Sequence, residues 1–149
     1  MKTEIYKLSA SELSNAYENK VLSPVEVTNS IIDRIKDIDD KVNAYVFIDE
    51  ESALQQAKDS EARWKNGSQK SPIDGVPAAI KDLLYTKGWP TLRGSKTISP
   101  NQEWNDDAPV TARMILRDMY RVGSDNWKAA CPFGVWGPFI PALGNCNPW

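Results

Sequence analysis

The sequence contains no histidine among its 149 residues. Catalysis by a Ser-His-Asp triad, by a Cys-His pair or at a histidine-ligated metal is therefore excluded within this chain. The two cysteines, Cys131 and Cys146, are too few for a disulfide framework or a four-thiolate zinc site. Acid–base chemistry near neutral pH would have to come from a carboxylate or a lysine whose surroundings change its protonation. We expect neither a metal ion nor another cofactor.

The chain also has no large excess of charge and no long hydrophobic run. Its 18 Lys and Arg against 20 Asp and Glu give a net charge of −2, and no basic stripe suggests nucleic acid. No apolar stretch approaches the roughly 18–20 residues of a membrane span, and Met1–Ala10 has no signal-peptide pattern. We expect one cytoplasmic domain that binds neither nucleic acid directly nor a membrane. The sequence leaves its oligomeric state open.

The first 70 residues predict mainly helices. A short helix can begin after Ser9 or Ser11. A longer helix is specified more fully, because Ser23, Pro24 and Glu26 form a capping box with proline at the first helical position. Its apolar side chains recur at helical spacing: Val27, Ile31, Ile35 and Ile38.

A β-prone run and a third helix complete this helical part. The run covers residues 44–48, and Asp49 follows it as the cap of a helix from Glu50 to Lys65. Because the apolar stripe of this helix is modest, we expect the helix to lie on the surface.

Residues 71–126 predict the start of an α/β core. Val76–Ile80 is apolar and small on both faces, as in a strand buried within a sheet, and it ends abruptly at Lys81 and Asp82. A charge at the end of a buried strand is where an α/β protein tends to place a functional group. The plain alternative is a lysine that simply reaches solvent. For Asp82 we expect capping or loop hydrogen bonding.

The remainder of the chain predicts a loop, a helix, a short strand and an unusual tail. Thr86–Ser95 has the composition of a loop, Asp107 is placed to cap a helix, and residues 120–123 suit a strand. Residues 127–149 are different, because they hold one charged side chain, four prolines and three tryptophans and follow no structural period. We interpret them as an irregular, aberrant tail.

The segment Gly75–Asp82, which reads GVPAAIKD, resembles the segment that carries the catalytic lysine of the amidase signature family. The likeness extends upstream to LSPVEV at residues 22–27, and downstream to GWPT at 88–91 and DAPVTAR at 107–113. These runs follow the family's order and spacing, and the resemblance covers residues 7–113. The family comprises serine hydrolases of small amides and the A subunit of the glutamyl-tRNA amidotransferases.

The resemblance implies an α/β fold in which N-terminal helices precede part of a mixed sheet with flanking helices. Residues 1–149 would be the N-terminal portion of one amidase domain. In similar enzymes a serine attacks the amide carbonyl, and a second serine in a cis peptide relays its proton to an unprotonated lysine. Lys81 matches that lysine. We expect it at the end of a central, largely buried strand with its amine facing a cavity, because burial favours the neutral form of an amine.

The catalytic serines of the family have no match in this chain. The likeness becomes patchy after Arg113, and the family's glycine- and serine-rich loop is absent. Ser95 lies in a glycine-containing loop but matches neither serine, and we expect no catalytic role for it. We therefore expect the chain to be inactive alone, and we interpret the residues after Asn126 as the result of a reading-frame disturbance or truncation of a longer gene.

Three interpretations of function stay open. The residues after Lys81 and the 107–113 run look more like those of the stand-alone amidases, which hydrolyse a small-molecule amide. A fragment of the glutamyl-tRNA(Gln) amidotransferase A subunit is the first alternative, and neighbouring genes for the other subunits would favour it. A non-catalytic binding remnant is the second, and a soluble product that melts cooperatively would favour it.

Overall fold

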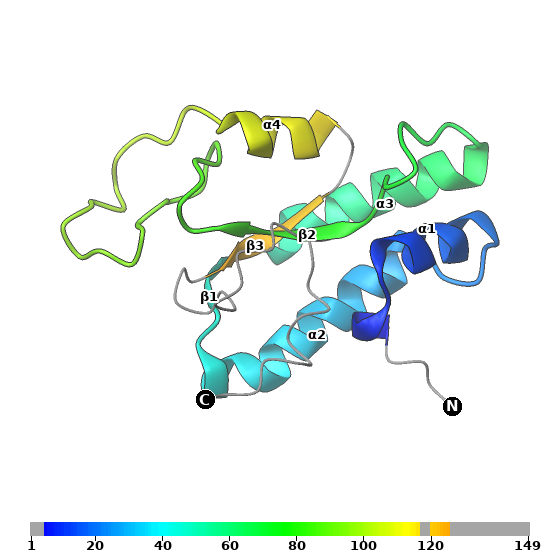
Figure 1. Ribbon diagram of the computed structural model, residues 1–149, viewed down its shortest axis with the longest axis horizontal. Coiled ribbons are helices and arrows are strands. Elements are labelled where there is room, and N and C mark those ends of the chain that lie inside the picture. Colours follow the sequence, from blue (N-terminus) through cyan, green and yellow to red (C-terminus); the bar gives the residue numbers. More distant parts are fainter. Residues whose placement is uncertain (1–4, 117–119, 126–149) are drawn as a thin grey trace.

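The computed structural model describes residues 5–116 and 120–125. A short 3₁₀ turn and four helices are present: η1 (Ile5–Lys7), α1 (Ala10–Glu18), α2 (Pro24–Val42), α3 (Glu50–Asn66) and α4 (Pro109–Leu116). The strands are β1 (Tyr45–Ile48), β2 (Pro77–Lys81) and β3 (Tyr120–Asp125). In Figure 1, α4 lies on one side of the strands and α1 and α2 lie on the other. The predicted α/β class, with helices before part of a mixed sheet, is confirmed.

The helices begin where side chains satisfy their first backbone N–H groups. In α2, the Glu26 backbone N–H donates to Ser23 Oγ over 3.2 Å, and the Ser23 N–H donates to the Glu26 carboxylate over 2.8 Å. This capping box confirms the predicted start of α2. Ser9, rather than Ser11, caps α1 in the same way. Asp49 caps α3 as predicted, since it accepts from the backbone of Ser52 over 3.0 Å.

The three strands form one mixed sheet in the order β1-β3-β2. β1 pairs with β3 antiparallel, and β2 pairs with β3 parallel. Parallel neighbours need a long crossover, which here contains α4. Within the described residues the central strand is β3, and β2 lies at an edge. The expectation of a central strand for Lys81 is therefore wrong for this part of the sheet, because β3 returns late in the chain and inserts between β1 and β2.

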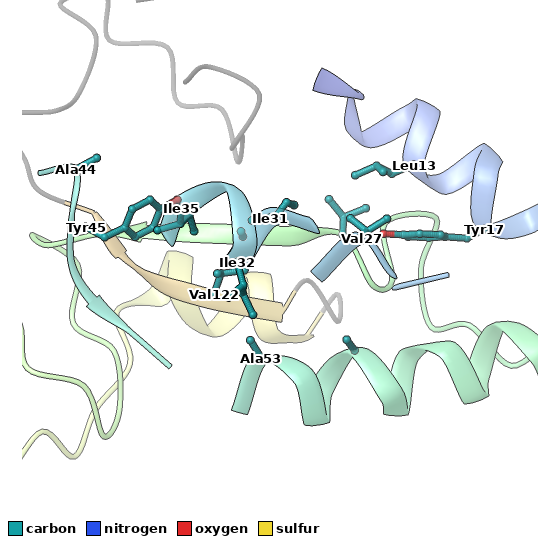
Figure 2. Close-up of a cluster of buried hydrophobic side chains, with 13 residues drawn as sticks. Leu13, Tyr17, Val27, Ile31, Ile32, Ile35, Ala44, Tyr45, Ala53 and Val122 are labelled. Carbon is teal, nitrogen blue, oxygen red and sulfur yellow. The ribbon is translucent and has the colours of Figure 1, made fainter. Parts of the chain in front are cut away.

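The main core lies between the helices and the sheet (Figure 2). One face of α2 is buried over the first two thirds of the helix through Val27, Ile31, Ile32 and Ile35. The buried face of α3 consists of small residues, Ala53, Ala57 and Ser60. These let α3 pack closely against both α2 and β3. The predicted surface position of α3 holds for most of its side chains. It does not hold for the narrow face of small residues, which is part of the core.

The predicted helix cap at Asp107 is wrong. Helix α4 begins at Pro109, and the Ala108 carbonyl accepts its first backbone hydrogen bond from Ala112 over 2.9 Å. The Asp107 carboxylate instead accepts from the backbone N–H of Lys87 over 2.8 Å. It also lies 3.8 Å from Arg121 Nη1 on β3. The Asp107 carboxylate thus interacts with Lys87 and Arg121, which are distant from it in the sequence. The residues around Asp107 do not predict either contact.

Candidate functional site

Lys81 is the last residue of β2, as the apolar run before it predicts. Pro77, Ala78 and Ile80 are buried, and Lys81 itself is half-buried. Its backbone lies opposite Asp125 in the parallel register with β3. The Lys81 carbonyl accepts from the N–H groups of Leu83 and Leu84, over 2.6 and 2.9 Å. The chain therefore turns sharply directly after the lysine, and these hydrogen bonds fix the position of the Lys81 backbone.

Asp82 ties this turn to the following loop. The residue is 1% exposed, and its carboxylate accepts from the backbone N–H of Leu92 over 2.8 Å and of Gly94 over 3.0 Å. The predicted role of Asp82 in loop hydrogen bonding is confirmed. Two charge-assisted hydrogen bonds to a buried carboxylate make a strong local clamp. The backbone beside Lys81 is therefore held from both the strand and the loop.

The start of β2 is anchored by a second buried carboxylate, which the sequence pattern does not reveal. Asp74 is fully buried and accepts from Arg63 Nε and Nη2, both over 2.7 Å, and from Ser60 Oγ over 2.7 Å. The backbone N–H of Lys70 donates to it over 3.1 Å. Burial raises the pKa of Asp74, but the hydrogen bonds from Arg63, Ser60 and Lys70 outweigh it, so the pKa lies below its usual value. The group is charged and joins α3 to the approach of β2.

Gly75 lets this approach pass close to the helices. Its φ of +80° is left-handed, and a Cβ at this position would overlap Ser60 Oγ and lie 2.9 Å from Pro24 Cγ. The Tyr17 hydroxyl donates to the Gly75 carbonyl over 3.0 Å. Residues of α1, α2 and α3 thus meet at one glycine, two residues before β2 begins. The Asp74-Gly75 pair in the sequence indicates a turn at this point. The sequence does not show which helices contact that turn.

The remaining candidates have ordinary structural roles or lie outside the described residues. The Ser95 hydroxyl lies 2.8 Å from that of Thr97, within the loop that Asp82 holds. Cys131, Cys146 and the tail at 127–149 are outside the described ranges. Among residues 5–116 and 120–125, no group of three potential metal ligands is present, and no helix has the length and apolar character needed to cross a membrane.

Comparison with known proteins identifies the class. A family model described as Amidase matches residues 26–131. The chain belongs to the amidase family. This agrees with the resemblance that the GVPAAIKD segment carries, and β2 with its terminal Lys81 lies inside the matched range.

Particular relatives come from both branches of the family. Over 154 residues the chain is 33% identical to the glutamyl-tRNA(Gln) amidotransferase A subunit of Salinispora tropica, covering 99% of this chain and 30% of the relative. A Geobacter protein of the same name is 40% identical over 132 residues, covering 83% and 27%. Among solved structures, a bacterial aryl acylamidase of the amidase signature family has a TM-score of 0.77 at 27% identity, covering 83% of this chain and 26% of that one.

The fold likeness extends to more distant amidases. A peptide amidase from Stenotrophomonas maltophilia shares the fold with a TM-score of 0.74 at 20% identity, covering 80% of this chain and 25% of that one. The chain thus spans 30% or less of the length of these relatives. These curated relatives are named as amidotransferase A subunits and the solved structures are amidases, so both interpretations have support. The expected preference for a stand-alone amidase stays a prediction.

Proposed function

We propose that this chain contributes the general base of an enzyme that hydrolyses a carboxylic amide, and that Lys81 is that base. The observation that carries the proposal is the position of Lys81 at the end of β2, within the range that matches the amidase family. The sharp turn after Lys81 and the Asp82 clamp support it, because a general base must be held within hydrogen-bond reach of the proton it takes.

The proposed reaction is a two-step acyl transfer. A serine attacks the amide carbonyl, and its proton passes through a second serine to the neutral Lys81 amine. The protonated lysine then returns the proton to the leaving amine as the C–N bond breaks, and water releases the acyl group by the reverse relay. Both serines would come from the glycine- and serine-rich part of the family domain, which matches no residue of this chain. A small-molecule amide substrate and a cytoplasmic location belong to the same proposal.

A second candidate is the corresponding part of a glutamyl-tRNA(Gln) amidotransferase A subunit. The names of the curated relatives favour it, at 33% and 40% identity. In that case the same lysine would serve amide cleavage within a larger assembly. Dependence of the activity on added partner proteins would favour this candidate, and full activity without them would favour the stand-alone amidase.

A chimaera tests the proposed base. Residues 1–125 of this chain would replace the matching N-terminal segment of the Salinispora tropica relative, and amide hydrolysis would be measured by ammonia release. Lys81→Ala should lower the rate by about 10²–10⁴-fold, the usual contribution of a general base. Lys87→Ala is the matched control, because Lys87 is exposed in the same region and its backbone N–H, which binds Asp107, is retained. A Lys81→Ala chimaera with unchanged turnover would contradict the assignment.

A further inference from the structure

The long segment between β2 and α4 carries a hollow of about 310 Å³ with an arginine and two aromatic rings in its wall. The rings of Tyr85 and Trp104 have centroids 6.1 Å apart and are inclined by 39°. The Arg93 guanidinium lies over the Tyr85 ring, with Cζ 5.3 Å from the centroid, and Nη2 donates to the Tyr85 hydroxyl over 3.0 Å. Figure 1 shows this segment extending away from the helices at the left of the view. Three hydroxyls and one amide complete the polar wall: Thr91, Thr97, Ser99 and Gln102.

The charge of Arg93 is not matched by an acidic side chain in the part of the chain that the structure describes. The nearby Glu103 carboxylate instead accepts from Asn105 Nδ2 over 2.9 Å. A guanidinium has five N–H groups, and the hydrogen bond to Tyr85 occupies one of the nitrogens of Arg93. The contact with the Tyr85 ring and the hydrogen bond from Nη2 hold the guanidinium in place, and its remaining N–H groups can bind a planar anion through two hydrogen bonds.

The backbone at Arg93 is an independent observation. Its φ of +55° is left-handed, a conformation that glycine adopts without strain and arginine does not, and Gly94 follows with a φ of +64°. The Asp82 carboxylate imposes this shape by accepting from the amides on either side, Leu92 and Gly94. Non-glycine residues that their surroundings hold in this conformation cluster at binding and active sites.

We propose that this hollow binds a small aromatic carboxylate. The carboxylate would accept two hydrogen bonds from Arg93, and the ring of the ligand would pack on Trp104 and Tyr85. A neutral aromatic compound would leave the arginine unmatched, and a phosphate would make no use of the rings. The site does not include Lys81, so the inference is independent of the proposed amide hydrolysis.

The test is a titration of the full 149-residue chain with benzoate, followed by the NMR signal of the Trp104 indole N–H. Trp104→Phe assigns that signal. Benzoate should give a saturable shift with an affinity about tenfold higher than benzyl alcohol, a neutral probe of similar shape, because a carboxylate–guanidinium pair adds charge-assisted hydrogen bonds. Arg93→Gln should lower the benzoate affinity to the level of benzyl alcohol. Arg113→Gln, an exposed arginine on α4, should leave it unchanged.

Arg93→Gly separates binding from folding. Glycine removes the guanidinium and relieves the left-handed strain, so benzoate binding should be lost while the melting temperature stays equal or rises. A lower melting temperature would assign Arg93 to packing on Tyr85 and overturn the proposal. Equal benzoate affinities of the wild type and Arg93→Gln, or no saturable shift in the wild type, would also overturn it.

Discussion

At the scale of single residues, two buried aspartates organise the region around β2. Asp74 joins α3 to the approach of the strand through Arg63 and Ser60, and Asp82 joins its end to the loop at Leu92 and Gly94. Each carboxylate accepts at least two hydrogen bonds, which offset the cost of burying its oxygens. β2 is therefore held at both ends by carboxylates rather than by apolar packing alone.

The Asp74 pair should contribute strongly to stability. Asp74→Asn keeps the shape but removes the buried negative charge that pairs with Arg63, so the free energy of unfolding should fall by about 3 kcal/mol. Chemical denaturation measures this loss. Asp106→Asn is the control, since Asp106 is exposed, and it should change stability little. A loss equal to that of the control would show that Arg63 finds another acceptor.

The same pair predicts a pH dependence with a definite sign. The pKa of Asp74 is lowered in the folded chain, so its contribution is fully present above the ordinary carboxyl pKa of about 3.9. As the pH falls below that value and through the lowered pKa, the contribution is lost. The stability difference between wild type and Asp74→Asn should therefore shrink below about pH 4 in denaturation at a series of pH values. A difference that grows on acidification would contradict this.

At the scale of elements, the loop after Lys81 owes its shape to one side chain. Asp82→Ala removes the acceptor of the Leu92 and Gly94 amides, so hydrogen exchange at those two amides should become at least about tenfold faster. Exchange in α2 should be unchanged, and Asp106→Ala should leave both amides protected. Unaltered exchange at Leu92 and Gly94 would mean that other contacts hold the loop.

The sequence predicted those elements whose causes are local. The start of α2 rests on Ser23 and Glu26, three residues apart, and β2 rests on a continuous apolar run. The Asp74–Arg63 pair was missed because its partners belong to a helix and a loop, which no spacing pattern relates. Asp107 was assigned wrongly for the same reason, since its carboxylate accepts a hydrogen bond from the backbone N–H of Lys87, 20 residues away. The hollow at Arg93 likewise depends on contacts that appear only in the fold.

At the scale of the whole molecule, the proposed function gives this chain the general base of amide hydrolysis and leaves both serines to the rest of the family domain. The purified 149-residue chain should hydrolyse no simple amide at an enzymatic rate, because a general base without a nucleophile and oxyanion donors has nothing to activate. Ammonia release from a panel of aliphatic and aromatic amides measures this. Turnover that disappears in Lys81→Ala would contradict the prediction and indicate a nucleophile within this chain, with Ser95 the first to be replaced.

The insertion of β3 between two earlier strands has a consequence for synthesis on the ribosome. α2 and α3 can pack on each other as soon as both have emerged, because they are consecutive helices joined by the short segment that contains β1. β1 and β2 are then already made but have no neighbour in the described sheet until residues 120–125 appear. At roughly 5–20 residues per second, this interval lasts a few seconds. For that time the nascent chain exposes two unpaired strand edges, and it is then most open to chaperones and to pairing with other nascent chains.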